Sequence, residues 1–183
     1  MRVIAGKARS IPLKTVEGLD TRPTTDRIKE TLFNMLQNEL ADCLFIDLFS
    51  GSGGIGIEAL SRGARKAIFV EKAPKAVACI QENLAKTKLE ADAVVMATDA
   101  VSAIYRLEAS EPAAFIFMDP PYNQQLEQQV LEALKNSSLV DEYTTIIIEA
   151  DLHTDFSYAE DLGYEITKQK KYKTNQHVFL ERV

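Results

Sequence analysis

The stretch LFIDLFSGSGGIG, residues 44–56, decides the fold of this chain. An apolar run leads into a cluster of glycines, and the following residues, IGIEALSRG, have the composition of a helix that stops at Gly63. A buried strand, a glycine-rich turn and a helix in this order are typical of the first unit of a doubly wound α/β sheet. Ligands of such sheets bind beyond the carboxyl ends of the strands, so we expect a binding site at the glycine loop.

Strand and helix signals alternate along the chain after this loop. Further apolar runs occupy residues 66–71, 93–99, 113–119 and 144–150. Because these runs are continuously apolar and are separated by helical segments, they predict a mostly parallel sheet that is covered on both faces. The last two runs, 164–172 and 176–183, are joined by a short connection and predict an antiparallel hairpin. The expected fold is therefore a seven-stranded, doubly wound, Rossmann-like α/β sheet with a C-terminal hairpin.

We expect a single domain over residues 1–183, because this length and an apolar content of 46% suit one sizeable core. Within it we distinguish a basic N-terminal arm (1–20), a leading helix (21–40) and the sheet core (41–183). The apolar face expected for the leading helix consists of Ile28, Leu32, Met35 and Leu36, with Thr24 or Thr25 as its cap.

Composition excludes several classes of protein. No apolar run approaches the roughly 20 residues that span a bilayer, and the first residues lack the apolar core of a secretory signal. We therefore expect a cytoplasmic protein without a membrane partner. Two separated cysteines and two histidines do not predict a metal site. Nothing in the sequence indicates an oligomeric state.

The charge is unevenly distributed. A net charge of −6 by itself argues against a nucleic-acid partner. The chain nevertheless begins with a basic segment that has no acid before Glu17, and the segment KQKKYK, residues 168–173, is basic as well. A basic face on an acidic protein would suit a nucleic acid. The candidate residues for binding it are Arg2, Lys7, Arg9, Lys14 and Arg22.

The loop Gly51-Ser52-Gly53-Gly54-Ile55-Gly56 matches the G-x-G-x-x-G pattern of dinucleotide sites, and Glu71 ends the next strand, where it could bind ribose hydroxyls. Asp47, however, precedes the loop, and its carboxylate would repel a diphosphate. It suits a ligand with a cationic amino group, such as S-adenosylmethionine. Asp99, at the end of the third strand, could accept a hydrogen bond from adenine. The expected cofactor-binding residues are Asp47, Phe49, Gly51, Gly53, Gly56, Glu71, Lys72, Asp99 and Ala100.

The segment MDPPYN, residues 118–123, follows the fourth strand, which should lie beside the first. An exocyclic amino group on a base is a poor nucleophile because its lone pair is delocalised into the ring. The Asp119 carboxylate and the Pro120 carbonyl could each accept one of its N–H groups and thereby aim the lone pair at a methyl carbon. Tyr122 could stack on a base that has turned out of its helix or loop. The expected catalytic residues are Asp119, Pro120 and Tyr122.

These motifs resemble those of a known family. DLFSGSGGIGIEAL, FVEK, TDA and MDPPY follow the order seen in class I amino-methyltransferases, while TRPTTDRIKETLFNML and MRVIAGKARSIPLKT resemble the corresponding segments of the RsmD family. The resemblance implies transfer of a methyl group from S-adenosylmethionine to N2 of a guanine in 16S ribosomal RNA, of the guanine-966 type. It also implies ribosomal RNA or a small-subunit particle as partner, and it places Arg22, Pro23 and Thr24 near the pocket. The chain has Ala8-Arg9-Ser10 where the family's arm usually has a Gly-Arg pair.

Three alternatives stay open at this point. A DNA methyltransferase acting on adenine N6 or cytosine N4 would share the Asp-Pro-Pro-Tyr motif, but it usually needs a sequence-reading module for which this chain has no spare residues. A nicotinamide-dependent oxidoreductase would use the same glycine loop and would leave Asp47 and residues 119–122 unexplained. A non-catalytic cofactor-binding subunit would have no use for Asp119 and Tyr122.

Overall fold

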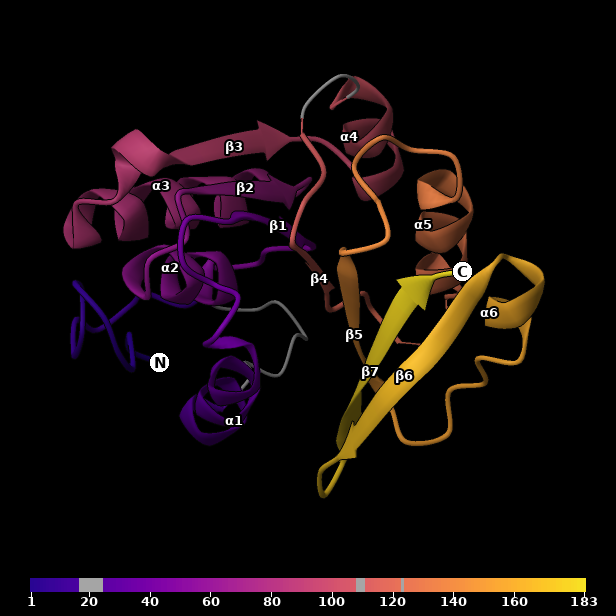
Figure 1. Ribbon diagram of the computed structural model, residues 1–183. Coiled ribbons are helices and arrows are strands. Elements are labelled where there is room, and N and C mark those ends of the chain that lie inside the picture. The colour runs from indigo at the N-terminus through magenta and orange to yellow at the C-terminus, as the bar shows by residue number, and fades with distance from the viewer. Residues whose placement is uncertain (17–24, 108–110, 123) are drawn as a thin grey trace.

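The computed structural model describes residues 1–16, 25–107, 111–122 and 124–183. Its centre is a seven-stranded sheet with the strand order β3-β2-β1-β4-β5-β7-β6 (Figure 1). The strands are β1 (Leu44–Leu48), β2 (Lys66–Glu71), β3 (Ala93–Ala97), β4 (Phe115–Met118), β5 (Thr145–Asp151), β6 (Tyr164–Lys171) and β7 (Asn175–Arg182). The helices are α1 (Asp26–Leu36), α2 (Gly54–Ser61), α3 (Pro74–Thr87), α4 (Ala100–Arg106), α5 (Leu126–Leu134) and α6 (Tyr158–Asp161), with a 3-10 turn at Glu90–Asp92.

The first five strands are parallel and the last two are antiparallel to their neighbours, which confirms the fold that the sequence predicts. From β1 the chain adds β2 and β3 on one side of the sheet and then β4 and β5 on the other. The strand order therefore reverses at β1, which lies between β2 and β4. Leu48 of β1 pairs with both Val70 and Met118, so the ends of these three strands meet at one edge of the sheet. The glycine loop and the Asp-Pro-Pro-Tyr segment therefore leave the sheet side by side.

Two observed strands are shorter than the apolar runs that predicted them. The run 93–99 ends as a strand at Ala97, because Asp99 serves as the N-cap of α4. The run 113–119 forms a strand only over Phe115–Met118. Ala113 donates its backbone N–H to the carbonyl of Leu139, and Pro120 and Pro121 have no N–H with which to extend the ladder.

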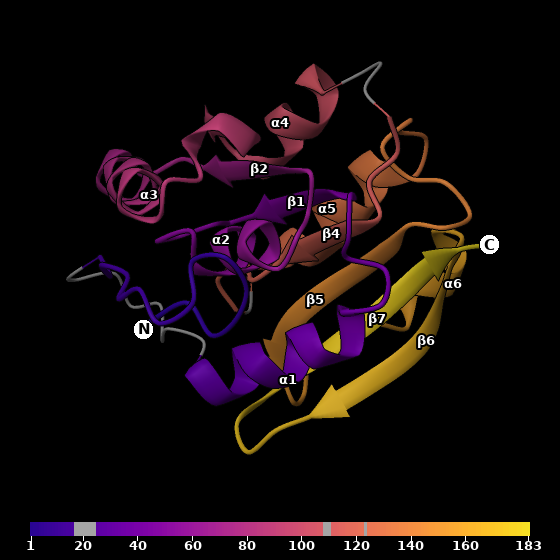
Figure 2. The same cartoon turned by 60° about the vertical axis from the view of Figure 1, so that its left-hand side comes forward.

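Helices cover both faces of the sheet. Figure 2 shows α1 and α2 on one side and α4 and α5 on the other. On the first side, Phe45, Phe69 and Phe117 of the sheet pack with residues of α1, α2, α3 and the N-terminal arm. On the second side, Ile46, Ile116 and Ile148 pack with residues of α4, α5 and α6. Hence consecutive residues of β1, β2, β4 and β5 are buried in different layers, as the continuously apolar runs require.

The buried face of α1 differs from the predicted one. Thr25 caps this helix by accepting a hydrogen bond from the backbone N–H of Ile28, as one of the two predicted caps. Leu32 and Leu36 are buried as expected, but the other buried residues are Lys29 and Phe33, and not the predicted Ile28 and Met35. The helix is rotated toward Phe33, whose ring stacks on Phe45 of β1 at 6.1 Å. That rotation places a lysine against the core.

The C-terminal hairpin completes the sheet with β7 between β5 and β6. A register shift between Ile166 and Lys168 interrupts the pairing of β6 with β7. Asn175, at the start of β7, pairs with Asp151 at the carboxyl end of β5. The turn of the hairpin therefore lies at the same edge of the sheet as the glycine loop. Among the described residues, no helix is both long and apolar enough to cross a membrane.

Candidate active site

A cavity of about 430 Å³ opens at the carboxyl edge of the parallel strands. This volume lies within the range of small-molecule sites. Among the residues that the sequence predicts for the site, Asp47, Phe49, Gly51, Glu71, Lys72, Asp99, Ala100 and Asp119 line the cavity. Residues from the ends of four neighbouring strands, which lie far apart in the chain, therefore face one space.

Asp47 lies on β1 under the first turn of α2. Its side chain is buried, and its Oδ2 accepts a hydrogen bond from the backbone N–H of Gly56 at 3.0 Å. Burial raises the pKa of this carboxyl to about 7, the Gly56 N–H opposes the rise and the charge of Glu71 adds to it. Among the described residues, no basic side chain lies within ion-pair distance of Asp47. A buried carboxylate is costly, and a ligand that brings a positive charge would offset that cost.

The glycine loop is held by Glu71 at the end of β2. Its Oε2 accepts from the N–H of Gly51 at 3.0 Å, and its Oε1 accepts from the N–H of Ala73 at 2.8 Å. The chain reaches this loop through Phe49, whose φ of 60° is left-handed and uncommon for a residue other than glycine. Gly51 and Gly53 also have positive φ, at 55° and 80°. Glu71 thus fixes the loop and retains lone pairs toward the cavity.

Two of the predicted cofactor-binding glycines have a packing role in this structure. Gly53 and Gly56 do not line the cavity. A Cβ on Gly56 would lie 2.4 Å from the ring of Phe69, and one on Gly53 would lie 3.3 Å from Ile80. Their small size therefore lets α2 approach β2 and α3 closely, so that the loop can turn where it does.

The adenine side of the predicted site is formed by β3 and α4. The Oδ1 of Asp99 accepts from the N–H of Ser102 at 2.9 Å, and this hydrogen bond holds the pKa of the carboxyl below its usual range. Ala100 follows as the first residue of α4, and Lys72, which follows the neighbouring strand β2, also lines the cavity. The Asp99 carboxylate is therefore charged at neutral pH and borders the cavity.

Asp119 follows β4 and faces the same cavity as Asp47 and Gly51. Burial raises its pKa well above the usual range, and the negative charges of Glu149 and Asp47 raise it further. Pro121 also lines the cavity, whereas the buried Pro120 and the 41% exposed Tyr122 do not. The rigid pair of prolines thus separates an acid inside the cavity from an aromatic ring at the surface.

A buried polar cluster lies behind Asp119. Glu149 follows Ile148, the partner of Met118, so it stands at the strand position beside Asp119. Its Oε2 is 3.2 Å from Nε2 of His177, and Nδ1 of the same ring is 3.1 Å from the hydroxyl of Tyr172. His177 is fully buried. The cluster links the carboxyl edge to the hairpin.

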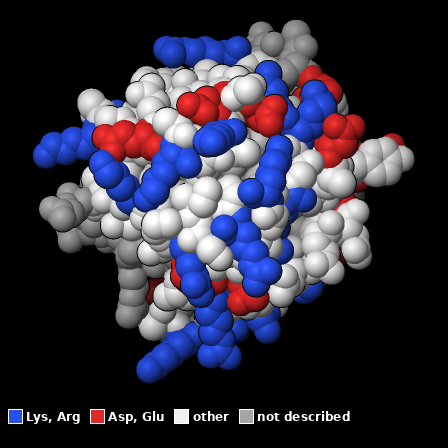
Figure 3. Space-filling model, turned by 90° about the vertical axis from the view of Figure 1, so that its left-hand side faces the viewer, with Lys and Arg blue, Asp and Glu red and all other residues white. Residues whose placement is uncertain are grey.

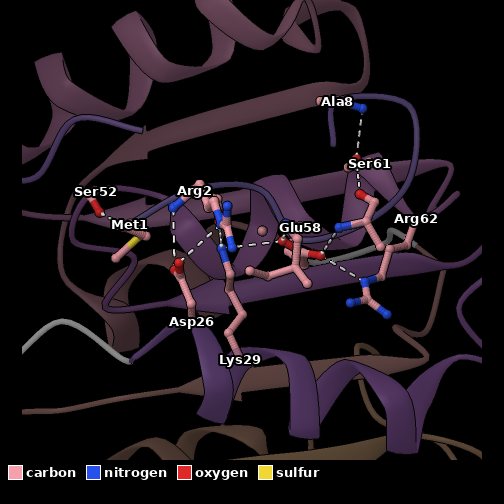
Figure 4. A network of polar contacts seen from close by, with 12 residues as sticks. Met1, Arg2, Ala8, Asp26, Lys29, Ser52, Glu58, Ser61 and Arg62 are labelled. Carbon is pink, nitrogen blue, oxygen red and sulfur yellow. Dashed lines mark hydrogen bonds and ion pairs between the residues drawn. The ribbon is translucent and has the colours of Figure 1, made fainter. Parts of the chain in front are cut away.

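The N-terminal arm is docked on α2 through Glu58 (Figure 4). This fully buried carboxylate accepts from the N–H groups of Ile4 and Ala5 at 2.8 and 3.0 Å, and it pairs with Nζ of Lys29 at 3.3 Å. Lys29 in turn donates to the carbonyl of Arg2 at 2.6 Å. The arm thereby brings Met1 against Ser52 of the glycine loop, and both Met1 and Lys29 line the cavity.

Sequence reasoning missed Met1 and Lys29 as cavity residues. The signal for Lys29 was its spacing: it precedes Phe33 by four residues and Leu36 by seven, on the face that the helix buries. No signal in the sequence marks Met1, because its place depends on how the arm folds back.

Some of the cations predicted to bind RNA form ion pairs with carboxylates of this protein. Arg2 pairs with Asp26 and Lys7 with Asp92, each at 3.5 Å, and Lys14 pairs with Glu82. Arg9 is exposed. Arg22, Pro23 and Thr24, together with part of the segment predicted as the leading helix, lie outside the described residues. The role of these cations in RNA binding stays a prediction.

Comparison with known proteins supports the methyltransferase interpretation of this geometry. The family model described as "Conserved hypothetical protein 95" matches residues 1–181. A relative named ribosomal RNA small subunit methyltransferase D, from Escherichia coli (strain K12), is 32% identical over 152 residues, which cover 83% of this chain and 75% of the relative. The chain belongs to the RsmD family.

Two further relatives extend the comparison. A protein of Bacillus subtilis named putative rRNA methyltransferase YlbH is 40% identical over 152 residues, covering 82% of this chain and 83% of the relative. The solved structure of the putative methyltransferase yhhF from Escherichia coli superposes with a TM-score of 0.83 at 30% identity, covering 100% of this chain and 97% of that one. RsmD family membership thus rests on sequence and structure together, and the fold is that of class I methyltransferases.

Proposed function

We propose that this RsmD family protein transfers a methyl group from S-adenosylmethionine to N2 of a guanine in 16S ribosomal RNA. The observation that carries the proposal is that Asp119 faces the same cavity as Asp47 and Gly51. An acid suited to grip an amino group and an acid suited to hold a cationic donor therefore border one space. The names of the relatives, which are ribosomal RNA methyltransferases, support RNA as the substrate.

The residues present fit this donor. When bound, S-adenosylmethionine supplies an electrophilic methyl carbon on a positively charged sulfur. The carboxylate of Asp47, whose pKa burial raises to about 7, would be stabilised as an anion by the donor's amino group. Glu71 would accept hydrogen bonds from the ribose hydroxyls, and Asp99 from the adenine amino group. In this arrangement Phe49 and Ala100 would be neighbours of the donor.

The target amino group would be held by Asp119 and the Pro120 carbonyl. Both would accept its N–H groups and favour a lone pair that points at the methyl carbon. Transfer would form an N–C bond and break the bond between the methyl carbon and sulfur, which would leave as a neutral thioether. The nitrogen would lose one proton, and the Asp119 carboxylate would receive it. Its raised pKa makes it a better proton acceptor than an ordinary aspartate. Tyr122, which is exposed at the surface three residues after Asp119, would stack on the base.

The alternatives account for less of this geometry. A nicotinamide-dependent oxidoreductase would place a diphosphate beside the buried Asp47. A DNA methyltransferase would share the Asp119 site, but the relatives are named for ribosomal RNA. We propose guanine 966 of 16S ribosomal RNA as the specific target and the cytoplasm as the place of the reaction.

The test is to measure methylation of 16S ribosomal RNA by Asp119→Asn and by the wild-type protein. We expect a loss of about 100-fold or more in kcat, because asparagine can neither take the proton nor grip the N–H with a charge. Donor affinity, measured by calorimetry, should change little. Asp161→Asn, an exposed carboxyl on α6, is the matched control. Equal activity of Asp119→Asn and wild type would refute the proposed role of this residue.

A further inference from the structure

The turn of the β6–β7 hairpin carries an unusual density of positive charge. Lys168, Lys170, Lys171 and Lys173 fall within six residues, without an acid among them, and all four are exposed. Figure 3 shows blue side chains along the lower edge of the molecule, where Figure 1 places this turn. The protein as a whole has a net charge of −6, so the positive charge of this edge is opposite in sign to the net charge of the protein.

These lysines are available to a partner in a way that most of the arm's cations are not. In the arm, Arg2, Lys7 and Lys14 each have a carboxylate within ion-pair distance. Within the part of the chain that the structure describes, no lysine of the hairpin has one, and the ammonium of Lys168 lies over the ring of Phe179 at 5.7 Å. The field of the hairpin therefore extends into solvent.

The turn lies near the side of the cavity where Asp119 would hold the target amino group. Asn175 pairs with Asp151 at the carboxyl end of β5, and β5 neighbours β4, which ends before Asp119. Adjacent strands are about 4.8 Å apart, so β6 lies roughly 14 Å from β4. That distance corresponds to about four phosphates along one strand of a duplex. The donor side of the cavity, at β2 and β3, is on the opposite flank.

The turn is also held firmly. Nδ2 of Asn175 donates to Oε1 of Glu149 at 2.5 Å, and the hydroxyl of Tyr172 contacts the His177 ring, which contacts Glu149. The backbone N–H of Tyr172 donates to the carbonyl of Asn175 at 2.8 Å. A polar cluster thus fixes the hairpin turn at the edge where Asp119 lies, and a surface fixed in this way can orient a bound strand relative to the site.

We propose that Lys170, Lys171 and Lys173 form the surface that holds the sugar-phosphate backbone of the target RNA next to the methylated nucleotide. The proposal rests on the proposed function and adds the contact surface. It adds the hairpin to Arg2, Lys7, Arg9, Lys14 and Arg22, the residues that the sequence predicts to bind RNA. Phosphates at the hairpin would position the strand without reading its sequence, and the pocket at Asp119 would select the base.

The test compares two triple variants. In the first, Lys170, Lys171 and Lys173 are replaced by alanine. In the control, Lys66, Lys86 and Lys135 are replaced; these are equally exposed lysines at the amino-terminal ends of strands and the ends of helices, away from the cavity. Affinity for 16S ribosomal RNA transcribed in vitro is measured from 50 to 300 mM salt, and affinity for S-adenosylmethionine is measured in parallel.

We expect the hairpin variant to bind RNA roughly 10- to 100-fold more weakly near 150 mM salt. Its plot of log Kd against log salt should be shallower by about 2, since each lost contact to single-stranded phosphate contributes about 0.7. Donor affinity should stay unchanged, and the control should keep the wild-type slope. If the hairpin and control variants behave alike while wild type methylates the RNA, the hairpin proposal is wrong. If wild type methylates no ribosomal RNA, the proposed function itself is wrong.

Discussion

At the scale of single residues, the charge of Asp119 is set by its neighbours. Glu149 stands beside it on the next strand, and the negative charges of Glu149 and Asp47 raise the pKa of Asp119 beyond what burial alone would do. A carboxyl that must accept a proton works best with a pKa near the working pH. Through its charge, Glu149 would therefore influence the proposed reaction although it does not line the cavity.

Glu149→Gln should shift the pH dependence of kcat. Without the charge of Glu149, the pKa of Asp119 falls, and the carboxylate form persists at lower pH. We expect the acidic limb of the kcat profile to move toward lower pH, while glutamine still accepts from Asn175 and donor affinity is retained. Asp151→Asn, at the end of the same strand, should leave the limb in place. A limb that moves upward or stays fixed in Glu149→Gln would contradict this account.

Asp47 should make the cofactor-free protein less stable as pH rises. Burial raises its pKa from 3.8 to about 7, so the folded state holds the proton more tightly than the unfolded chain. Its contribution to stability is fully present below pH 4 and is lost as pH rises toward 7. In Asp47→Asn, the decline in unfolding free energy from pH 5 to pH 8 should be smaller by about 2–3 kcal/mol.

Urea unfolding of the cofactor-free proteins at pH 5 and pH 8 measures this difference. Asp99→Asn serves as a comparison, because the pKa of the Asp99 carboxyl is lowered and not raised in the folded protein. Equal pH dependence in wild type and Asp47→Asn would show that Asp47 is already ionised at low cost. The same replacement should weaken donor binding, because the amide no longer offers a negative charge to the donor's amino group.

Residue types at strand ends were predictable, but their precise environments were not. Asp47, Glu71, Asp99 and Asp119 each follow or end an apolar run, and parallel strands bring such positions to one edge. The left-handed φ of Phe49 could not be read from its side chain, because phenylalanine normally avoids that region. The roles of Gly53 and Gly56 depend on Ile80 and Phe69, residues of other elements.

At the scale of elements, one buried carboxylate contacts the arm, α1 and α2. Glu58 of α2 accepts two backbone N–H groups of the arm and pairs with Lys29 of α1 and with Arg62, the C-cap of α2. Since Lys29 is 1% exposed, its charge depends on this partner. Arm, α1 and α2 should therefore lose their mutual order together when the carboxylate is removed.

Glu58→Gln should destabilise the fold by about 3–5 kcal/mol, because it leaves a buried ammonium without a counter-charge. The amides of Ile4 and Ala5 should exchange hydrogen faster, since one amide oxygen replaces two carboxylate oxygens. Glu111→Gln is the control: its pair with Arg65 is exposed and should contribute within about 0.5 kcal/mol. Unchanged exchange at Ile4 and Ala5 in Glu58→Gln would show that the arm is held by other contacts.

The elements themselves were largely predictable, and their docking was not. Continuous apolar runs identified β1, β2, β4 and β5, because burial on both faces leaves that pattern. The arm gave no periodic signal; its Val3, Ala8 and Leu13 are buried only because the chain folds back between Arg2 and Pro12. The face of α1 was misjudged because a lysine was assumed to be exposed.

At the scale of the whole molecule, the strand order separates the residues proposed to bind the donor from those proposed to bind the target RNA. β1, β2 and β3 bring Asp47, Glu71 and Asp99 to the donor side, and β4 brings Asp119 to the centre. The hairpin, added antiparallel beyond β5, extends the edge on the target side. An acidic protein can thus place its cationic ligand over carboxylates and its polyanionic substrate over lysines, on two flanks of one edge.

Donor binding should stabilise the entire domain, because the cavity joins the ends of four strands and the docked arm through Met1 and Lys29. A ligand at 100 times its Kd adds about 2.7 kcal/mol to the unfolding free energy, and a domain of this length gains about 2–4 °C in Tm per kcal/mol. S-adenosylmethionine at that excess should therefore raise Tm by roughly 5–11 °C. NAD at the same concentration should not, since its diphosphate would meet Asp47. Asp47→Ala should show a smaller rise with S-adenosylmethionine, by about 1.4 kcal/mol for each tenfold loss of affinity. A shift with NAD and none with S-adenosylmethionine would reverse the assignment of the glycine loop.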